Sequence, residues 1–248
     1  MSLLKYASLT CIALTLGACQ SVFQPSGPKP LAFTPDASEQ LKAGCSGDDC
    51  PLVNIETVQF ANAPALNALI EQRLLNMTVN SPDEKMAPSL AAYREQFLRT
   101  AQPRNSTYLQ AKVREQHDGL VIVELSSYLD TGGAHGMPGR GFINWSAKDQ
   151  KPVTLQDMLL PGQEQAFWGA AKVAHNNWLI SNGYSNDPAF VKNWPFQQTP
   201  NVALLKDNVA LKYDVYSIAP YSEGHVELQI PYSRLNGILK PEWFPTQH

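Results

Sequence analysis

A histidine set among glycines is the residue whose type and setting could most readily do chemistry. His135 lies in the string Gly132-Gly133-Ala134-His135-Gly136, where glycine lets the backbone take unusual dihedral angles and approach another group closely. Its ring could contact a ligand or act as a general base. Alternatively, its ring nitrogens hydrogen-bond nearby backbone and hold the loop in place. The sequence favours this second interpretation, and it predicts no catalytic residue.

The motifs of familiar catalytic and metal sites do not occur in the sequence. It contains no Gly-x-Ser-x-Gly nucleophile elbow and no His-Glu-x-x-His metal-binding pair. The five histidines are scattered along the chain, at His117, His135, His175, His225 and His248. His175 shares a predicted buried helix face with Trp178, which indicates a core residue with satisfied hydrogen bonds. We therefore expect no metal site and no cofactor.

Two cysteines form a close pair in Cys45-Ser46-Gly47-Asp48-Asp49-Cys50. In an oxidising compartment such a pair forms a disulfide that closes a small loop. A zinc site would need further ligands at matching spacing, and none is nearby. A redox-active pair usually has the closer Cys-x-x-Cys spacing. The sequence therefore predicts a structural disulfide between Cys45 and Cys50.

The N-terminus has the order of a secretory signal: one positive charge at Lys5, a short apolar run over 7–16, and small residues before a cysteine. The string Leu16-Gly17-Ala18-Cys19 resembles a bacterial lipobox, which implies cleavage before Cys19 and attachment of lipid to its sulfur. The alternatives are an ordinary signal peptide with an incidental cysteine, or a core helix. The run is too short to span a bilayer at ~20 residues, which favours the lipoprotein interpretation. An inner-membrane retention signal would usually place Asp directly after the lipidated cysteine. This chain has Gln20 there, which favours the outer membrane. We expect a lipid-anchored protein that faces the periplasm or the cell surface.

The charge of the chain gives no sign of a nucleic-acid partner. The sequence holds 19 Lys and Arg against 22 Asp and Glu, for a formal net charge of −3. So weak an acidic balance provides neither the basic surface that nucleic acid needs nor one that attracts an anionic membrane. We therefore expect no nucleic-acid partner.

The elements that would position these residues begin with a spacer. Residues 20–44 are rich in proline, serine and glycine, which predicts a tether with no fold of its own. A strand is predicted over Leu52–Val58, where apolar and polar residues alternate. Helical periodicity follows over 62–77, with Asn62 as its cap, and a second helix is predicted over Pro88–Arg99.

Hairpins and helices alternate in the rest of the chain. Asp118-Gly119 is a strong two-residue hairpin signal between alternating segments over 108–114 and 120–125. Further elements are expected in this order: a strand at Phe142–Trp145, a helix start at Thr154, a helix over 164–182 ended by Gly183, a hairpin at Asp207-Asn208, a strand over Val226–Ile230 and a helical turn at 235–239. Because tight turns link the strands, this order predicts an α+β fold with largely antiparallel sheets and packed helices.

Two stretches resemble a known family. The first runs from Tyr128 through Gly132-Gly133-Ala134-His135-Gly136 to Leu159, and the second is Tyr213–Gly224 with the strand behind it. Together they resemble the extracellular domain of RsiV-type anti-sigma factors and the non-catalytic region of PdaC-type peptidoglycan deacetylases, over roughly 52–239. The resemblance implies an α+β fold, a role at the cell wall and, for RsiV itself, binding of C-type lysozyme. The sigma-binding segment of RsiV and the deacetylase domain of PdaC are expected to be lacking, which would leave only the binding module.

The two resembling stretches contain the candidate binding residues. These are Gly133 and His135 in the first, and Tyr216, Pro220 and Tyr221 in the second. Rigid aromatic rings and proline on a loop make good interface anchors. The alternative is that Tyr216 and Tyr221 fold back and cap the core. If both loops follow strands of one sheet, His135, Pro220 and Tyr221 could form a single surface.

The sequence therefore predicts a cell-envelope lipoprotein with a noncatalytic RsiV-like binding domain, for which lysozyme or peptidoglycan would be the partner. An enzyme that modifies peptidoglycan or another envelope polysaccharide is one alternative, and a structural lipoprotein that binds another membrane protein is a second. The predicted division is a signal peptide over 1–18, a lipidated tether with the disulfide loop over 19–51, an N-terminal α+β subdomain over 52–150 and a C-terminal RsiV-like subdomain over 151–248.

Overall fold

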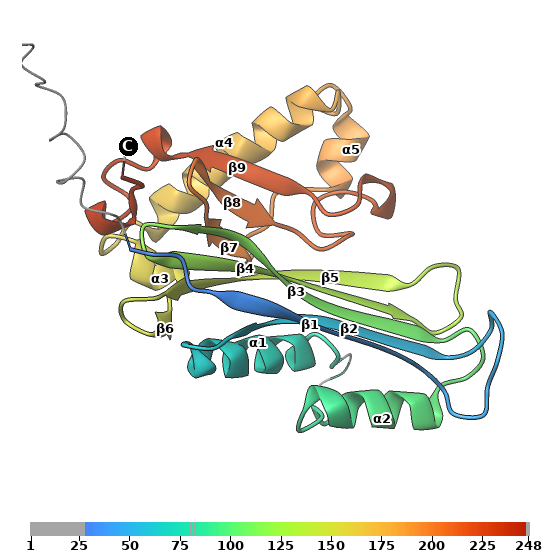
Figure 1. Ribbon diagram of the computed structural model, residues 1–248. Helices are drawn as coiled ribbons and strands as arrows, with labels where there is room; N and C mark the ends of the chain where they lie inside the picture. Colours follow the sequence, from blue (N-terminus) through green and yellow to red (C-terminus); the bar gives the residue numbers. More distant parts are fainter. Residues whose placement is uncertain (1–27, 80, 82, 247–248) are drawn as a thin grey trace, which may run out of the picture.

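The computed structural model describes residues 28–79, 81 and 83–246 of the chain, so the predicted signal peptide and Cys19 lie outside the described residues. Within this part, a six-stranded sheet has its strands in sequence order (Figure 1). All neighbours in it are antiparallel except β2 and β3, which are parallel. Its strands are β1 (Phe33–Leu41), β2 (Leu52–Phe60), β3 (Ser106–His117), β4 (Leu120–Asp130), β5 (Met137–Ser146) and β6 (Lys151–Pro152).

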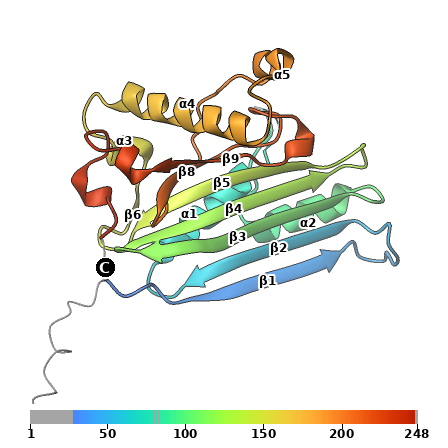
Figure 2. The same ribbon diagram turned by 90° about the horizontal axis from the view of Figure 1, so that it is seen from above.

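A smaller antiparallel sheet packs on one face of the large one. In the described residues it consists of β7 (Val202–Leu204), β8 (Asn208–Lys212) and β9 (Glu227–Pro231). Helix α4 (Glu164–Ser181) lies over it, whereas α1 (Pro64–Asn76) and α2 (Leu90–Thr100) cover the opposite face of the large sheet (Figures 1 and 2). The predicted α+β fold with largely antiparallel sheets is confirmed.

Shorter helical elements complete the described chain. They are α3 (Leu155–Met158), α5 (Pro188–Asn193) and 3-10 turns at Tyr221–Glu223, Tyr232–Arg234 and Pro241–Trp243. Helices α1 and α2 form the crossover that a parallel β2–β3 pair requires. Among the helices of the described residues, none is both long and apolar enough to span a bilayer.

Strand β4 is where the two hydrophobic cores of the molecule meet. Its run Leu120-Val121-Ile122-Val123 is buried throughout. Leu120 and Ile122 belong to the core shared with α4, whereas Val121 and Val123 belong to the core shared with α1. Successive side chains of a strand point to opposite faces, so a strand covered on both sides carries an unbroken apolar run.

Most elements lie where the sequence predicts them. The hairpin at Asp118-Gly119 is confirmed: both residues have positive φ, 47° and 81°, as a type I′ turn requires. The longer helices are confirmed as α1, α2 and α4, and the second hairpin as β7–β8. The predicted cap Asn62 is wrong, because Ala63 precedes the first helical residue, Pro64. Helix α5 was not predicted.

Strand β1 corrects the prediction of a tether over 20–44. It pairs with β2 along its whole length, from Phe33 opposite Phe60 to Leu41 opposite Leu52, so order begins well before Leu52. Nearly every β1 side chain is exposed, so the segment lacks the apolar alternation that identifies most strands. Pro35 is tolerated because β1 is an edge strand, where an N–H is not needed on the open side.

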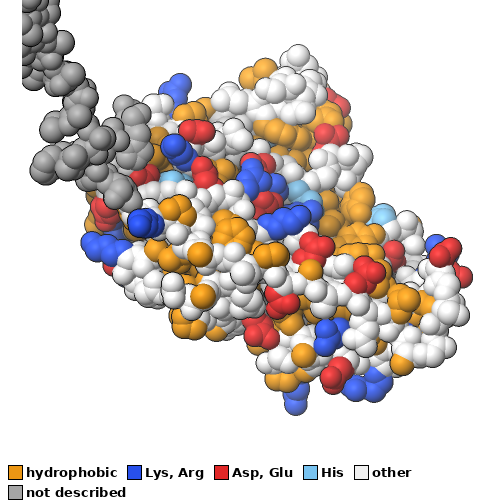
Figure 3. All heavy atoms as spheres, viewed as in Figure 1, with side chains coloured by type: hydrophobic (Ala, Val, Ile, Leu, Met, Phe, Trp, Pro, Cys, Tyr) orange, Lys and Arg blue, Asp and Glu red, His pale blue; other side chains and the backbone are white. Residues whose placement is uncertain are grey.

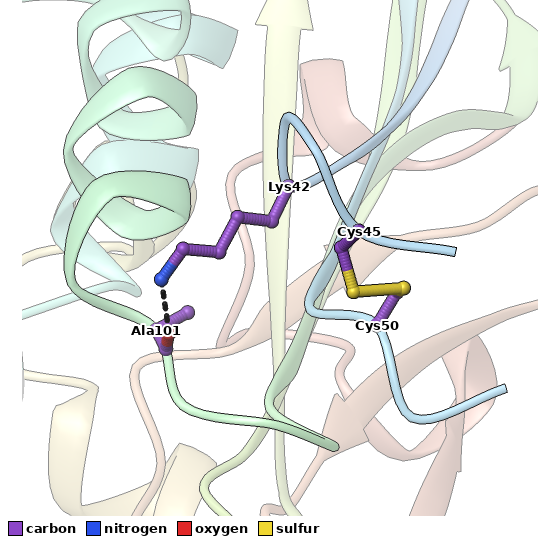
Figure 4. Close-up of a disulfide and its surroundings, with 4 residues drawn as sticks. All are labelled: Lys42, Cys45, Cys50 and Ala101. Atoms are coloured by element: carbon purple, nitrogen blue, oxygen red, sulfur yellow. Dashed lines mark hydrogen bonds between the residues drawn. A yellow bond between two sulfur atoms is a disulfide. The ribbon is translucent and has the colours of Figure 1, made fainter. Parts of the chain in front are cut away.

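A disulfide between Cys45 and Cys50 lies in the turn that joins β1 to β2 (Figure 4). Lys42 holds the same turn at two points. Its N–H donates to the Pro51 carbonyl at 3.0 Å, and its Nζ donates to the Ala101 carbonyl at 2.8 Å, at the end of α2. An ammonium suits a helix C-terminus, where carbonyls lack partners within the helix and carry partial negative charge. The disulfide turn is thereby fixed to the helix layer.

The small sheet is attached to the large one through the edge of β7. Asn144 of β5 donates from Nδ2 to the Val202 carbonyl at 2.7 Å and accepts at Oδ1 from the Leu204 N–H at 2.8 Å. The amide thus takes the place of a neighbouring strand. Asn144 is only 5% exposed, so water is not an alternative partner for these two backbone groups.

Two residues of β3 continue the pairing along this edge. His117 Nε2 lies 2.9 Å from the Leu204 carbonyl, which can only accept, so the ring donates. Glu115 Oε2 accepts from the Lys206 N–H at 3.0 Å. Side chains of the large sheet therefore bond to the backbone groups along the β7 edge, which no other strand of the described residues covers.

His175 lies on α4 with its ring stacked near Trp178, 6.2 Å between centroids and 10° between planes. It is buried as predicted, but its Nε2 has no hydrogen-bond partner among the described residues. The expectation that its hydrogen bonds are satisfied is therefore wrong. Burial lowers the pKa of His175 below its ordinary value, because the charged ring would lose its hydration.

Truncation of the Asn144 side chain should cause a large loss of stability, because its amide pairs with two backbone groups of β7. Asn144→Ala leaves two buried backbone groups unpaired at about 1–3 kcal/mol each, so the free energy of unfolding should fall by about 2–6 kcal/mol in urea denaturation. Asn201→Ala is the matched control, since that amide makes one hydrogen bond at a partly buried position, to the Arg140 carbonyl. Equal losses in the two variants would contradict the bridging role.

The lowered pKa of His175 predicts that the free energy of unfolding depends on pH. Its pKa is lowered in the folded state, so below about pH 6.5 the unfolded chain binds a proton that the folded chain does not, and stability falls. His175→Phe keeps an aromatic ring but cannot titrate. From about pH 8 to about pH 5, the free energy of unfolding should therefore fall less in the variant. Parallel curves for the two proteins would show that His175 does not contribute. His225 also has a lowered pKa and is present in both proteins, so some dependence should remain.

Candidate functional site

Two loops that are far apart in the sequence meet at one end of the molecule. Residues 131–136 join β4 to β5, and residues 213–226 join β8 to β9 (Figures 1 and 2). The prediction that the flanking strands share one sheet is wrong, because β4 and β5 lie in the large sheet and β8 and β9 in the small one. The loops still meet, because the small sheet packs across the large sheet with its loop above the β4–β5 turn.

Asp214 fixes the second loop to the edge of β5. Its Oδ1 accepts from the Arg140 N–H at 2.7 Å, while Asn201 Nδ2 donates to the Arg140 carbonyl at 3.0 Å. Both backbone groups of Arg140 are thus paired with side chains of the C-terminal part of the chain. Burial lowers the pKa of the Arg140 guanidinium, an effect that the Glu124 and Asp214 carboxylates oppose.

The ring of His135 stacks on Tyr221, with 4.1 Å between centroids and 29° between planes. Its Nδ1 lies 3.0 Å from the Gly136 carbonyl, and its Nε2 lies 3.3 Å from Tyr216 Oη. A carbonyl oxygen only accepts, so the neutral ring protonated on Nδ1 satisfies both contacts, with Tyr216 donating to Nε2. The Nδ1 contact holds the first loop, and the Nε2 contact joins it to the second.

Tyr216 presents its ring to solvent. It is 46% exposed and has a φ of 65°, an uncommon conformation for a residue with a side chain. Val215 and Ile218, on either side of it in the sequence, are buried. The interpretation in which Tyr216 caps the core is therefore wrong. Its ring packs against Trp194, at 6.4 Å between centroids and 27° between planes.

Tyr221 begins a short 3-10 turn that the half-buried Pro220 precedes. Its Oη donates to the Gly136 carbonyl at 3.2 Å, so the ring is both stacked and hydrogen-bonded to the first loop. At the end of the turn, Tyr184 Oη donates to Glu223 Oε1 at 2.6 Å. This hydrogen bond to the Glu223 carboxylate raises the pKa of the Tyr184 phenol.

Gly136, rather than Gly133, is the glycine whose size the first loop requires. Its N–H donates to Tyr128 Oη at 3.2 Å, and a Cβ added there would lie 2.6 Å from the same oxygen. Gly133 was predicted as a binding residue, but its φ is not positive and an added Cβ would meet only the His135 carbonyl, at 3.9 Å. The structure therefore places Gly133 in the loop without a specific contact.

These rings form what we call the aromatic loop surface: Tyr128, His135, Trp194, Tyr216 and Tyr221. Figure 3 shows hydrophobic side chains and histidine gathered at this end of the molecule. Sequence reasoning missed two of its members. Trp194 follows the unpredicted helix α5 and has no periodic signal. Tyr128 faces Tyr108 across β3 and β4 because the register shifts between Val113 and Glu115, which the hairpin signal at Asp118-Gly119 does not encode.

The partners of His135 define what the arrangement can offer to a ligand. Within the described chain, the hydrogen bonds of His135 go to a backbone carbonyl and to a tyrosine hydroxyl, not to a serine, a cysteine or a carboxylate. Among the same residues, no three His, Cys, Asp or Glu side chains lie close enough to hold a metal ion. The surface offers aromatic faces, hydroxyl groups and one imidazole in fixed positions.

The chain matches a known protein family over part of its length. A family model described as a protein of unknown function (DUF3298) matches residues 156–233. This range includes Tyr216, Pro220 and Tyr221 of the second loop but not His135. Among curated proteins, the peptidoglycan-N-acetylmuramic acid deacetylase PdaC of Bacillus subtilis is 22% identical over 203 residues, which is 75% of this chain. The match covers 43% of the deacetylase, so the chain spans less than half of its length.

Solved structures give closer matches. A DUF3298 family protein from Pseudomonas aeruginosa PAO1 is 59% identical, with a TM-score of 0.85 over 88% of this chain and 99% of that one. A DUF3298 family member from Bacteroides fragilis NCTC 9343 is 18% identical, with a TM-score of 0.70 over 87% of this chain and 96% of that one. At that identity the second match shows a shared fold alone.

The two glycines of the first loop form a matched pair for testing its geometry. Gly136→Ala would push the Tyr128 ring aside and displace His135, so we expect a loss of about 1–3 kcal/mol in unfolding free energy, the usual range for overpacking. Gly133→Ala has room for its methyl group and should stay within about 0.5 kcal/mol of the parent protein. Urea denaturation measures both. The reverse order of losses would show that the loop geometry is wrong.

Proposed function

The chain belongs to the DUF3298 family, and we propose that it is a noncatalytic binding module of the cell envelope that captures a cell-wall protein through the aromatic loop surface. The observation that carries this proposal is the stacking of His135 on Tyr221, which joins loops from two different sheets into one exposed patch. Aromatic side chains that are held in place and open to solvent are typical of the centres of protein interfaces.

The rigidity of the patch favours binding. His135 and Tyr221 are fixed by the stack and by two contacts to the Gly136 carbonyl. Tyr216 is held by its backbone, by His135 and by Trp194. Side chains that are ordered before a partner arrives lose little conformational entropy on binding, so more of the contact energy is kept as affinity.

A partner at the cell wall is supported by two likenesses. The Bacillus subtilis relative is named for action on peptidoglycan, and the loops resemble those of RsiV, for which the family implies binding of C-type lysozyme. We therefore choose C-type lysozyme as the partner. The lipid anchor predicted at Cys19 would hold the module outside the cytoplasm, at the outer membrane, where such an enzyme arrives.

Calorimetric titration of the chain with C-type lysozyme tests the proposal. Wild type should bind at micromolar protein, and Tyr216→Ala should weaken binding by at least about tenfold, since a central interface aromatic contributes about 2 kcal/mol or more. The melting temperature should change little, because the Tyr216 ring is largely outside the core.

Ile180→Ala is the control, because Ile180 is an exposed hydrophobic side chain of α4 outside the aromatic loop surface. It should bind as wild type does. The absence of heat with wild type would refute lysozyme as the partner. Equal affinity of wild type and Tyr216→Ala would instead remove the aromatic loop surface from the interface.

A further inference from the structure

In the part of the chain that the structure describes, the edge of β5 away from β4 is left uncovered by other strands over most of its length. The pairing of β5 with β4 is continuous from Leu129 opposite Met137 to Leu120 opposite Ser146, and β6 pairs only with Trp145 and Ser146. In an antiparallel pair, alternate residues turn both backbone groups toward the neighbour and the others turn both away. The residues of β5 that turn away from β4 can be identified from their partners.

Arg140 and Asn144 both turn away from β4, and both have partners. The Arg140 groups bond to Asp214 and Asn201, and the Asn144 carbonyl accepts from the Val153 N–H at 2.7 Å. Phe142 lies midway between them, so its N–H and C=O also turn away from β4. Among the described residues, neither group has a hydrogen-bond partner. Phe142, with both outward backbone groups unpaired among the described residues, therefore lies between Arg140, whose two groups are paired, and Asn144, whose carbonyl is paired.

The unpaired residue lies in a cleft of about 490 Å³. One wall includes Arg73 of α1, and the opposite wall includes Glu164 and Trp168 of α4. Gln156 and Gln198, both exposed, add amide groups to the lining. Arg73 is exposed and forms no ion pair within the described part of the chain, so its guanidinium is available to a ligand.

We propose that this cleft binds an extended peptide, one residue of which pairs with Phe142 through both backbone groups while its C-terminal carboxylate bonds to Arg73. A peptide residue in extended conformation supplies an acceptor and a donor at the spacing that an open strand residue presents, which is how sheet edges recognise peptides. The planar guanidinium matches a carboxylate with two parallel hydrogen bonds. This site is separate from the aromatic loop surface and goes beyond the proposed function.

Amide hydrogen exchange followed by NMR tests the premise on the free protein. The Phe142 amide should exchange rapidly, whereas the Arg140 amide, bonded to Asp214, should be protected. Protection of the Phe142 amide in the free protein would overturn the proposal, because the edge would then already be occupied.

The ligand is tested with acetylated tetra-alanine peptides that end either in a carboxylate or in an amide. Both should slow exchange at Phe142 at millimolar peptide, and the carboxylate form should bind more tightly, on the order of tenfold, for one charged hydrogen-bonded contact. Arg73→Gln should remove that difference and leave the amide form unaffected. Arg99→Gln, on the exposed last turn of α2, is the control and should preserve the difference.

Two variants separate the Phe142 N–H from its side chain. Phe142→Pro removes the donor. Its N–H turns away from β4, as at Pro138 of the same strand, so the change removes no hydrogen bond between β4 and β5. Phe142→Leu keeps the donor. The proline variant should lose peptide binding, and the leucine variant should retain it. Equal binding by the two would overturn the proposal.

If the proline variant does not fold, ester-substituted peptides test main-chain pairing with the wild-type protein instead. Replacing its amides one at a time by esters removes one N–H each, and a single position should lose affinity for wild-type protein. No loss at any position would overturn main-chain pairing. A tetramer of N-acetylglucosamine serves as the competing ligand. If it slows exchange at Phe142 and the peptides do not, the cleft binds glycan and the proposal is wrong.

Discussion

Among the described residues, the edge of β7 away from β8 has no neighbouring strand, and the side-chain amide of Asn144 supplies the partner that this edge lacks. Its two hydrogen bonds, to Val202 and Leu204, lie at the buried boundary between the two sheets. His117 and Glu115 extend the pairing from β3. Because hydrogen bonds are directional, these contacts fix where the small sheet lies on the large one, which hydrophobic packing alone would not do.

The position of the small sheet determines what forms at its two exposed margins. At one end it brings the β8–β9 loop over the β4–β5 turn. His135 and Tyr221 stack there although they are far apart in the sequence. Along β5, the same docking closes Arg140 with Asp214 and Asn201 but leaves Phe142 open. The aromatic loop surface and the cleft therefore both follow from how the sheets are joined.

Local patterns in the sequence predicted most elements but not their arrangement. The Asp118-Gly119 hairpin and helix α4 follow from turn chemistry and helical periodicity. Strand β1 was missed because its side chains are exposed on both faces and carry no periodic signal. His135 and Tyr221 are neighbours as predicted, but the prediction that their loops share a sheet is wrong. Tyr216 also contacts His135, although the predicted surface consisted of His135, Pro220 and Tyr221. The contribution of Trp194 depends on long-range packing, which no local pattern encodes.

The central claim is that two loops from different sheets act as one binding surface. Hydrogen–deuterium exchange of the full chain, with and without C-type lysozyme, tests it most directly because exchange reports on every segment at once. Residues 131–136 and 213–226 should both become protected from exchange when lysozyme is added. Protection of other segments while both loops stay unchanged, or of one loop without the other, would contradict it.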